Sequence, residues 1–157
     1  MNGFDILAAG TAQILPREDF IKKLAHNRPL RIKLGADPTS PNLHLSHAVV
    51  LKKMRQFQDL GHEVIFLIGD FTARIGDPTG RSKTRIPLDE NTILENTRTY
   101  LEQVSRILDP TKLTIRSNSE WLDGLSAKEW ITLCARTTLA RITEREDFSE
   151  RIAAHQP

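Results

Sequence analysis

Two histidines three positions apart, His44 and His47, are the residues of this sequence best suited to chemistry on phosphate. They stand near the start of a segment with helical periodicity, where residues three apart project from the same side. The first turn of a helix has unpaired N–H groups and a partial positive charge, which favour phosphate. Imidazole N–H groups there would add charge-assisted hydrogen bonds of about 1.5–3 kcal/mol each. Aimed at charge that develops in a transition state, two such bonds could supply about a thousandfold acceleration.

Two other interpretations apply to this histidine pair. His47 falls in an apolar stripe, so it could equally be a packed core histidine. Zinc binding is less well supported, because no further Cys or His stands at ligand spacing nearby.

Two aspartates, Asp37 and Asp77, each precede a proline in a turn-forming segment. Asp-Pro is a common turn former, which is a sufficient structural explanation for either residue alone. If the two turns lie at the ends of neighbouring strands, however, the paired carboxylates would suit an ammonium group. Five nearby cations would balance the carboxylates, bind phosphate or lie in a solvated loop: Lys33, Arg74, Arg81, Lys83 and Arg85.

Periodicity predicts a strand–helix–strand unit that positions these residues. A short strand is expected over residues 30–34, and a strand buried on both faces over residues 63–69, where the sequence is almost continuously apolar. Between them, Ser40 is expected to cap a helix that has Pro41 at its first position and ends at Gly61. Its buried stripe would contain Leu43, His47, Val50, Met54 and Phe57. A helix of that length makes the two strands parallel, and residues 30–85 are the predicted binding core.

The remaining chain continues the alternation of strands and helices. Residues 1–24 predict one or two short helices broken near Pro16, and residues 69–84 predict a loop. A helix capped by Asp89 is expected to end before Pro110, with a third strand over residues 112–116. A capping box at residues 126–129 opens another helix, and a last helix is expected over residues 138–153. The buried face of the Asp89 helix would contain Leu94, Leu101, Val104 and Leu108. This order predicts an α/β domain around a parallel sheet.

Ligands of parallel α/β sheets bind at the carboxyl ends of the strands. The segments 35–47 and 69–81 leave those ends, and we expect them to face each other across one crevice. Their glycines allow close approach of the backbone to a ligand: Gly35, Gly69, Gly76 and Gly80. The segments contain neither a P-loop nor a G-x-G-x-x-G pattern, which disfavours a standard kinase or dehydrogenase.

Composition fits one domain, with 157 residues, 39% apolar residues and a net charge of +2. A lone cysteine, Cys134, cannot form an internal disulfide, so a cytoplasmic location is expected, with Cys134 as a core filler. The first residues do not read as a secretory signal, and no apolar run approaches the roughly 20 residues of a membrane span.

Taken together, these segments resemble class I aminoacyl-tRNA synthetases, specifically the tyrosyl enzymes. Residues 43–47, Leu-His-Leu-Ser-His, resemble the HIGH signature. Residues 35–39 before it, and residues 69–70 and 75–80 after it, resemble the tyrosyl subgroup. The order and spacing of the three segments carry the resemblance, which runs through nearly the whole chain.

The resemblance implies an incomplete HIGH-type catalytic domain: a Rossmann-like nucleotide-binding domain with a parallel sheet and flanking helices. Such a domain activates tyrosine with ATP and Mg²⁺ and passes it to tRNA, in a protein expected to be a homodimer. His44 and His47, with Thr39, would act on the phosphates. Asp37 would lie by the ribose and the tyrosine pocket, and Asp77 would help to hold the tyrosine ammonium. The other implied substrate contacts are Lys33, Gly35, Gly69 and Asp70, and the implied ATP contacts are Leu43, Leu45, Ser46, Arg81 and Arg85.

Three departures from the family pattern matter for function. Lys33 stands where many relatives have a tyrosine that contacts the substrate hydroxyl. Ser46 replaces the glycine of the signature and would crowd the adenine, so weaker ATP binding is expected. No Lys-x-Ser-Lys-like segment is present in the 157 residues, which correspond to the N-terminal half of the family's catalytic domain. Little aminoacylation by this polypeptide alone is therefore expected, as is self-association through exposed apolar faces.

Two alternatives to a synthetase fragment remain. A small HIGH-type nucleotidyltransferase would transfer adenylate to another substrate, although the Asp-Pro-Thr and Gly-Asp-Pro segments argue against it. A non-catalytic synthetase paralogue would bind nucleotide, RNA or a protein partner, and Ser46 favours it over a working enzyme. Salt-sensitive RNA binding without ATP turnover would identify the paralogue.

Overall fold

Three parallel strands form the sheet of this protein, whose computed structural model describes residues 3–26, 28–75 and 88–155. The strands are β1 (Arg31–Ala36), β2 (Glu63–Ile68) and β3 (Leu113–Ser117), in the order β1-β2-β3. Leu34 pairs with Phe66, and Phe66 pairs with Ile115. The parallel sheet confirms the α/β prediction. β1 extends two residues beyond the expected end, because its pairing with β2 continues to Ala36 and Ile68.

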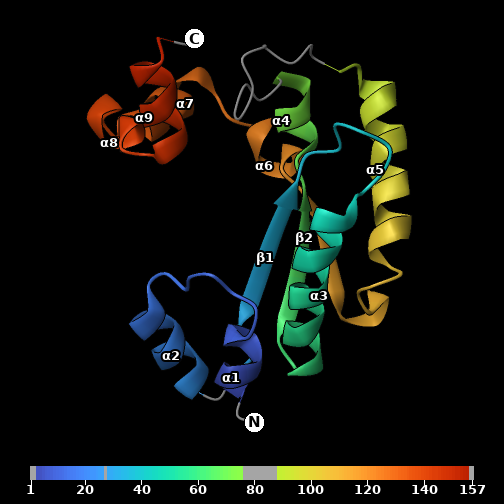
Figure 1. Cartoon of the computed structure of the whole chain (residues 1–157). Coiled ribbons are helices and arrows are strands. Elements are labelled where there is room, and N and C mark those ends of the chain that lie inside the picture. Colours follow the sequence, from blue (N-terminus) through green and yellow to red (C-terminus); the bar gives the residue numbers. More distant parts are fainter. Residues whose placement is uncertain (1–2, 27, 76–87, 156–157) are drawn as a thin grey trace.

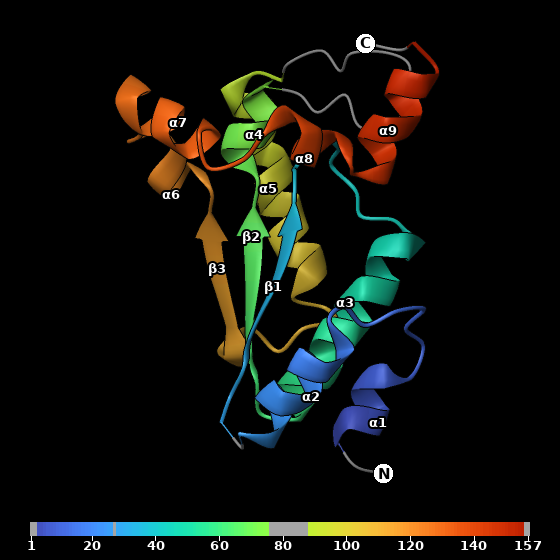
Figure 2. The ribbon, with the colours of Figure 1, turned by 90° about the vertical axis from the view of Figure 1, so that its left-hand side faces the viewer.

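Helices α3 (Leu45–Asp59) and α5 (Glu90–Val104) cover one face of the sheet (Figures 1 and 2). The core lies between this face and the two helices. β2 is the central strand, which explains its continuous apolar sequence. The buried core cluster consists of Leu51, Met54, Val64, Phe66, Ile68, Tyr100, Val104 and Leu108.

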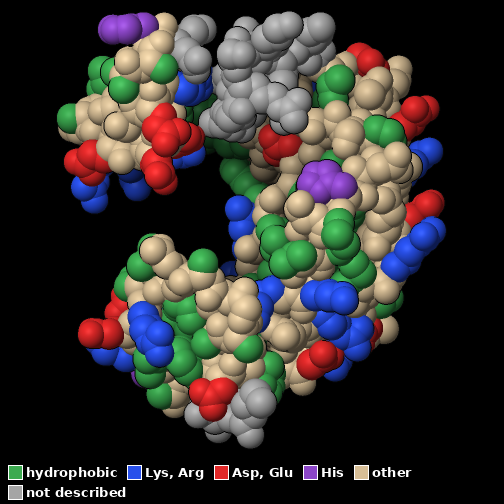
Figure 3. All heavy atoms as spheres, viewed as in Figure 1, with side chains coloured by type: hydrophobic (Ala, Val, Ile, Leu, Met, Phe, Trp, Pro, Cys, Tyr) green, Lys and Arg blue, Asp and Glu red, His purple; other side chains and the backbone are tan. Residues whose placement is uncertain are grey.

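In the described part of the chain, the helices other than α3 and α5 lie near the two ends of the sheet. Helices α1 (Gly3–Ala8) and α2 (Arg17–Ala25) lie near the start of β1, and α7 (Ala127–Cys134), α8 (Leu139–Thr143) and α9 (Glu146–Ala153) lie beyond the carboxyl ends of the strands. Figure 3 shows a deep hollow between these two groups. Short elements complete the described chain: α4 (Asp70–Ile75), the 3₁₀ turn η1 (Pro110–Lys112) and α6 (Ser119–Leu122). Among the described residues, no helix is both long and apolar enough to cross a membrane.

The start of α3 differs from the prediction. Its N-cap is His44, and Ser40 lies in a loop that precedes it. Three side chains of α5 hold this loop: the Asn96 amide donates to Pro38 O at 2.9 Å, Thr99 Oγ1 donates to Pro41 O at 2.6 Å, and Gln103 Oε1 accepts from the Leu43 N–H at 2.9 Å. The tertiary hydrogen bonds therefore override the local cap signal at residues 40–41.

The buried faces of both long helices agree with the predicted stripes only in part: Met54, Val104 and Leu108 are buried as expected. In α3 the buried residues are Leu51, Met54 and Gln58, while Val50 is exposed. In α5, Leu94 is 53% exposed, and Ile93 points inward instead. Asn96 and Tyr100 lie on the same buried face as Ile93. Because both are polar, the sequence did not indicate that this face is buried.

Three further expectations were wrong. Residues 70–75 form helix α4 where a loop was expected. The helix over residues 138–153 is two helices, because Glu144 ends α8 and Arg145 caps α9. Cys134 is exposed, so it does not fill the core. In contrast, the Asp89 cap, the Ser126–Glu129 capping box and the turn at Gly61, whose φ is 82°, confirm the local signals.

Candidate functional site

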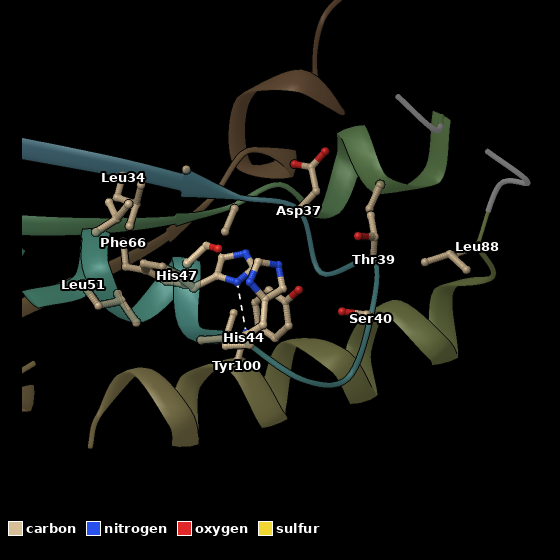
Figure 4. Close-up of a pocket in the computed structure, with 16 residues that line it drawn as sticks. Leu34, Asp37, Thr39, Ser40, His44, His47, Leu51, Phe66, Leu88 and Tyr100 are labelled. Atoms are coloured by element: carbon tan, nitrogen blue, oxygen red, sulfur yellow. Dashed lines mark hydrogen bonds between the residues drawn. The ribbon is translucent and has the colours of Figure 1, made fainter. Parts of the chain in front are cut away.

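A cavity of about 980 Å³ opens where β1 ends and α3 begins. Seven of the predicted site residues line it: Gly35, Asp37, Thr39, Leu43, His44, Ser46 and His47. Figure 4 places the two imidazoles between Asp37 on one side and Tyr100 on the other, with Leu34, Leu51 and Phe66 at the apolar end. The cavity therefore joins a polar rim to an apolar end.

The two histidines form a pair at the first turn of α3. Their ring centroids lie 4.0 Å apart, and the His44 N–H donates to His47 Nδ1 at 3.2 Å (Figure 4). Because Nδ1 accepts this bond, the ring proton of neutral His47 is on Nε2, which leaves an N–H for a ligand. His47 is half-buried and lines the cavity, so it is not an enclosed core histidine.

Partial burial lowers the pKa of His47, and the neighbouring His44 lowers it further. The lowered pKa favours the neutral form of His47 at physiological pH. A neutral ring can keep its Nδ1 bond to the backbone while its Nε2–H donates to a ligand.

We expect the stability of the protein to fall as the pH drops below the ordinary histidine pKa of 6.5. Burial lowers the pKa of His62 as well as that of His47, and His62 Nδ1 accepts from the Leu30 N–H at 3.2 Å. Below pH 6.5 these two histidines bind protons more readily in the unfolded chain than in the folded chain. Their contribution to the free energy of unfolding is therefore fully present above pH 6.5 and is lost on acidification.

Urea unfolding at pH values from about 8 down to about 5 measures this loss of unfolding free energy. This range lies above the ordinary pKa values of carboxylates, so their titration contributes little. The variant His47→Asn/His62→Asn, whose amide oxygens can accept the same N–H bonds, should show a smaller decrease in the unfolding free energy. An equal decrease in this variant and the wild type would contradict the assignment.

Asp37 is oriented by a chain of hydrogen bonds that crosses all three strand ends. Thr72 Oγ1 lies 2.9 Å from Asp37 Oδ1 and donates to it, and it accepts from the Asn118 amide at 3.0 Å. Asn118, which is buried, accepts from the Phe71 N–H at 2.8 Å through its Oδ1. The carboxylate is therefore held by groups that lie 35 and more residues away in the sequence.

Gly69 makes room for this carboxylate. A Cβ at position 69 would lie 1.7 Å from Asp37 Oδ1 and 2.7 Å from Thr72 Oγ1. Gly69 is itself buried, and its N–H donates to Ala36 O at 2.9 Å. Its absent side chain is thus what lets the ends of β1 and β2 approach with Asp37 between them.

Like Gly69, three further predicted site residues are not among those that line the cavity. Lys33 is exposed and, because side chains alternate along β1, lies on the face opposite Leu34. Leu45 is 82% exposed at the start of α3. Asp70 starts α4 and accepts from the Ser119 N–H at 3.0 Å and from Ser119 Oγ at 2.6 Å, which ties α4 to α6. Asp77, Arg81 and Arg85 lie outside the described residues.

The first turn of α3 offers unpaired backbone donors to the cavity region. The N–H groups of Leu45 and Ser46 have no acceptor among the described residues, as is normal for the first turn of a helix. The helix is 15 residues long, and its positive end favours an anion. In residues 3–26, 28–75 and 88–155, no group of three or more His, Cys, Asp or Glu side chains is placed to hold a metal ion.

Several residues of the site have no signal in the sequence. Thr72 and Asn118 orient Asp37, and Asn96 and Gln103 hold the loop, yet each acts across at least 35 positions. Tyr100 also lines the cavity, but it lies on α5, whose sequence predicts only that one face packs in the core. Pairings of this range are decided by the fold, so spacing rules could not find them.

Comparison with known proteins adds evidence independent of this geometry. The family described as "tRNA synthetases class I (W and Y)" matches residues 25–157. The curated relative "Tyrosine--tRNA ligase" of Aquifex aeolicus (strain VF5) is 58% identical over 146 residues, which are 93% of this chain and 37% of the relative. The one of Coxiella burnetii is 53% identical over 154 residues, which are 98% of this chain and 39% of the relative. The chain thus spans less than two fifths of the length of these two relatives.

Solved structures resemble the fold. A C-terminally truncated mitochondrial tyrosyl-tRNA synthetase of Aspergillus nidulans superposes with a TM-score of 0.74 at 22% identity, over 91% of this chain and 44% of that chain. A tyrosyl-tRNA synthetase of Archaeoglobus fulgidus, solved with L-tyrosine, gives a TM-score of 0.70 at 20% identity, over 88% of this chain and 41% of that chain. At these identities the likeness concerns the fold alone.

Proposed function

The chain belongs to the class I tRNA synthetases of the tryptophan and tyrosine group, and from this premise we propose that it forms the ATP- and tyrosine-binding part of a tyrosine–tRNA ligase. One observation carries the proposal: His44, His47, Thr39 and Asp37 line a single cavity at the carboxyl end of β1. That is the position at which parallel α/β sheets bind their ligands.

The reaction proposed is attack of the tyrosine carboxylate on the α-phosphate of ATP, with release of pyrophosphate. His47, neutral and with its proton on Nε2, donates to a phosphate oxygen, and His44 and the Thr39 hydroxyl add further donors. The open N–H groups at the start of α3 face the same negative charge. These donors are preorganised, so they stabilise charge that develops on the phosphate without having to reorganise.

Asp37 serves the other substrate or the ribose in this proposal. Its carboxylate is held by Thr72 and can accept from a ribose hydroxyl or lie by the tyrosine ammonium. Asp77 is proposed as a second ammonium ligand, and Arg81 and Arg85 as contacts to ATP. Gly35, Leu43 and Ser46 line the cavity and are proposed as substrate and nucleotide contacts. Lys33, Leu45, Gly69 and Asp70 are proposed as further contacts, although they are not among the residues that line the cavity.

The cofactor and partners follow from the same proposal. Mg²⁺ would enter with ATP, bound by its phosphates. The tyrosyl group would pass to tRNA, and the protein would act as a homodimer in the cytoplasm.

Calorimetric titration with ATP, followed by a tyrosine-dependent ATP–pyrophosphate exchange assay, tests the proposed function. We expect ATP to bind with an affinity that depends on its phosphates. Exchange that requires tyrosine would identify the ligase chemistry. ATP binding with no exchange would favour the nucleotide-binding paralogue, and absence of ATP binding would reject the proposal.

Ser46→Gly should strengthen ATP binding. Ser46 is exposed on the first turn of α3 and lines the cavity, so its side chain occupies space over which a base would stack. We expect a severalfold lower dissociation constant for ATP, on the order of 1 kcal/mol. Ser40→Gly, on the loop at the same cavity, is a matched control. No gain from Ser46→Gly would show that the hydroxymethyl group does not obstruct the nucleotide.

A further inference from the structure

Tyr100 is a buried side chain whose hydroxyl has no hydrogen-bond partner among the residues that the structure describes. The residue is 2% exposed and lies on the buried face of α5, where it belongs to the core cluster. Its hydroxyl makes no hydrogen bond to any residue that the structure describes, although buried tyrosine hydroxyls usually find a partner. Its neighbours on α5 behave differently, since Asn96, Thr99 and Gln103 all bond to the loop over residues 38–43.

The Tyr100 hydroxyl is open to the cavity. Among the described residues, the fully enclosed side-chain polar atoms that lack a partner are limited to Gln56 Oε1. The Tyr100 oxygen is therefore not enclosed, and the space that Tyr100 lines is the cavity. Figure 4 shows its ring beside the imidazole of His44, under the two histidines.

The surroundings of this hydroxyl favour an anion. The first turn of α3, with its open Leu45 and Ser46 N–H groups, starts directly after His44. The acidic side chain of the cavity, Asp37, is engaged by Thr72 and lies on the other side of the imidazoles. A phenol donates more readily to a charged oxygen than to a neutral one, and such bonds are the stronger kind.

We propose that the Tyr100 hydroxyl is a phosphate-binding group of this site and donates a hydrogen bond to a non-bridging phosphate oxygen of the nucleotide. The assignment rests on the proposed function, because it names a further contact to the same ATP. It gives the phosphate a donor from α5 in addition to those from α3. Tyr100 also closes the cavity floor, so its ring and its hydroxyl have separate roles: the ring packs and the hydroxyl binds.

The test is Tyr100→Phe, which removes the hydroxyl and keeps the ring. We expect the dissociation constants of ATP and of inorganic tripolyphosphate to rise about tenfold, and that of adenosine to stay unchanged. The thermal unfolding midpoint should equal that of the wild type, because the hydroxyl has no partner to lose among residues 3–26, 28–75 and 88–155. This keeps a binding effect separate from a folding effect.

A direct probe is available because Tyr100 is the only tyrosine in the sequence. Protein labelled with 3-fluorotyrosine gives one ¹⁹F resonance, which should shift with tripolyphosphate and not with adenosine. Equal ATP affinity in the wild type and Tyr100→Phe would overturn the assignment and leave the proposed function intact. A loss of adenosine affinity equal to that of ATP would also overturn it, since the contact would then be to ribose or base. A wild-type protein that binds neither ATP nor tripolyphosphate would reject the proposed function together with this assignment.

Discussion

Gly69→Ala is expected to destabilise the protein by about 1–3 kcal/mol and to displace Asp37 from the cavity. The added Cβ would lie 1.7 Å from Asp37 Oδ1, a distance that no small adjustment relieves. The Thr72 hydroxyl is the next atom, at 2.7 Å, so the bond that orients Asp37 would break as the carboxylate moves. Thr72 cannot withdraw freely, because its hydroxyl also accepts from the Asn118 amide.

Urea unfolding measures the first effect and nucleotide titration the second. Gly124→Ala is the matched control, because a Cβ there meets no atom within 4 Å. Its unfolding free energy should change by less than about 0.5 kcal/mol. If Gly69→Ala were as stable as Gly124→Ala and bound ATP like the wild type, the close approach of the two strand ends would have no role in the site.

Replacing both histidines is expected to have the largest effect on the nucleotide. In His44→Ala/His47→Ala the dissociation constant of ATP should rise about 100-fold, since two bonds of about 1.5 kcal/mol each are lost. The affinity for adenosine should remain, because the lost donors face phosphate. Removal of His47 also leaves the His44 N–H without its Nδ1 acceptor, which weakens the first turn of α3.

His26→Ala provides the control for loss of a histidine, because His26 is exposed at the end of α2 and far in the fold from the cavity. It should bind ATP like the wild type. A further comparison is His47→Asn, whose amide can retain the backbone bond while the Nε2 donor disappears. If the double variant bound ATP normally, the phosphate role of the imidazole pair would be wrong, whatever the family of the chain.

The parts of the site that the sequence predicted share one property: each depends on neighbours within a few positions. His44 and His47 form a pair because residues three apart meet on a helical turn. Asp37 follows β1 directly, and the parallel sheet brings the end of that strand to the ligand-binding edge. The Asp89 cap and the Ser126–Glu129 box are likewise local hydrogen bonds.

The parts that were wrong depend on distant residues. Ser40 and Pro41 predict the start of a helix at this point. Side chains of α5 instead hydrogen-bond to the carbonyl of Pro41 and the N–H of Leu43, so α3 begins later. Leu94 was expected inside, but the polar Asn96 is buried instead because it bonds to Pro38.

The sequence by itself determined the order of the three strands and the two long helices, the helical turn with its two histidines, and the turn that carries Asp37, because local periodicity and capping set these. Only the tertiary structure decided how Asp37 is held, which face of α5 is buried, and that Tyr100 lies under the imidazoles. These outcomes depend on hydrogen bonds and packing between residues tens of positions apart. No local pattern encodes such pairings, since they exist only once α5 and β3 have packed against the first two strands.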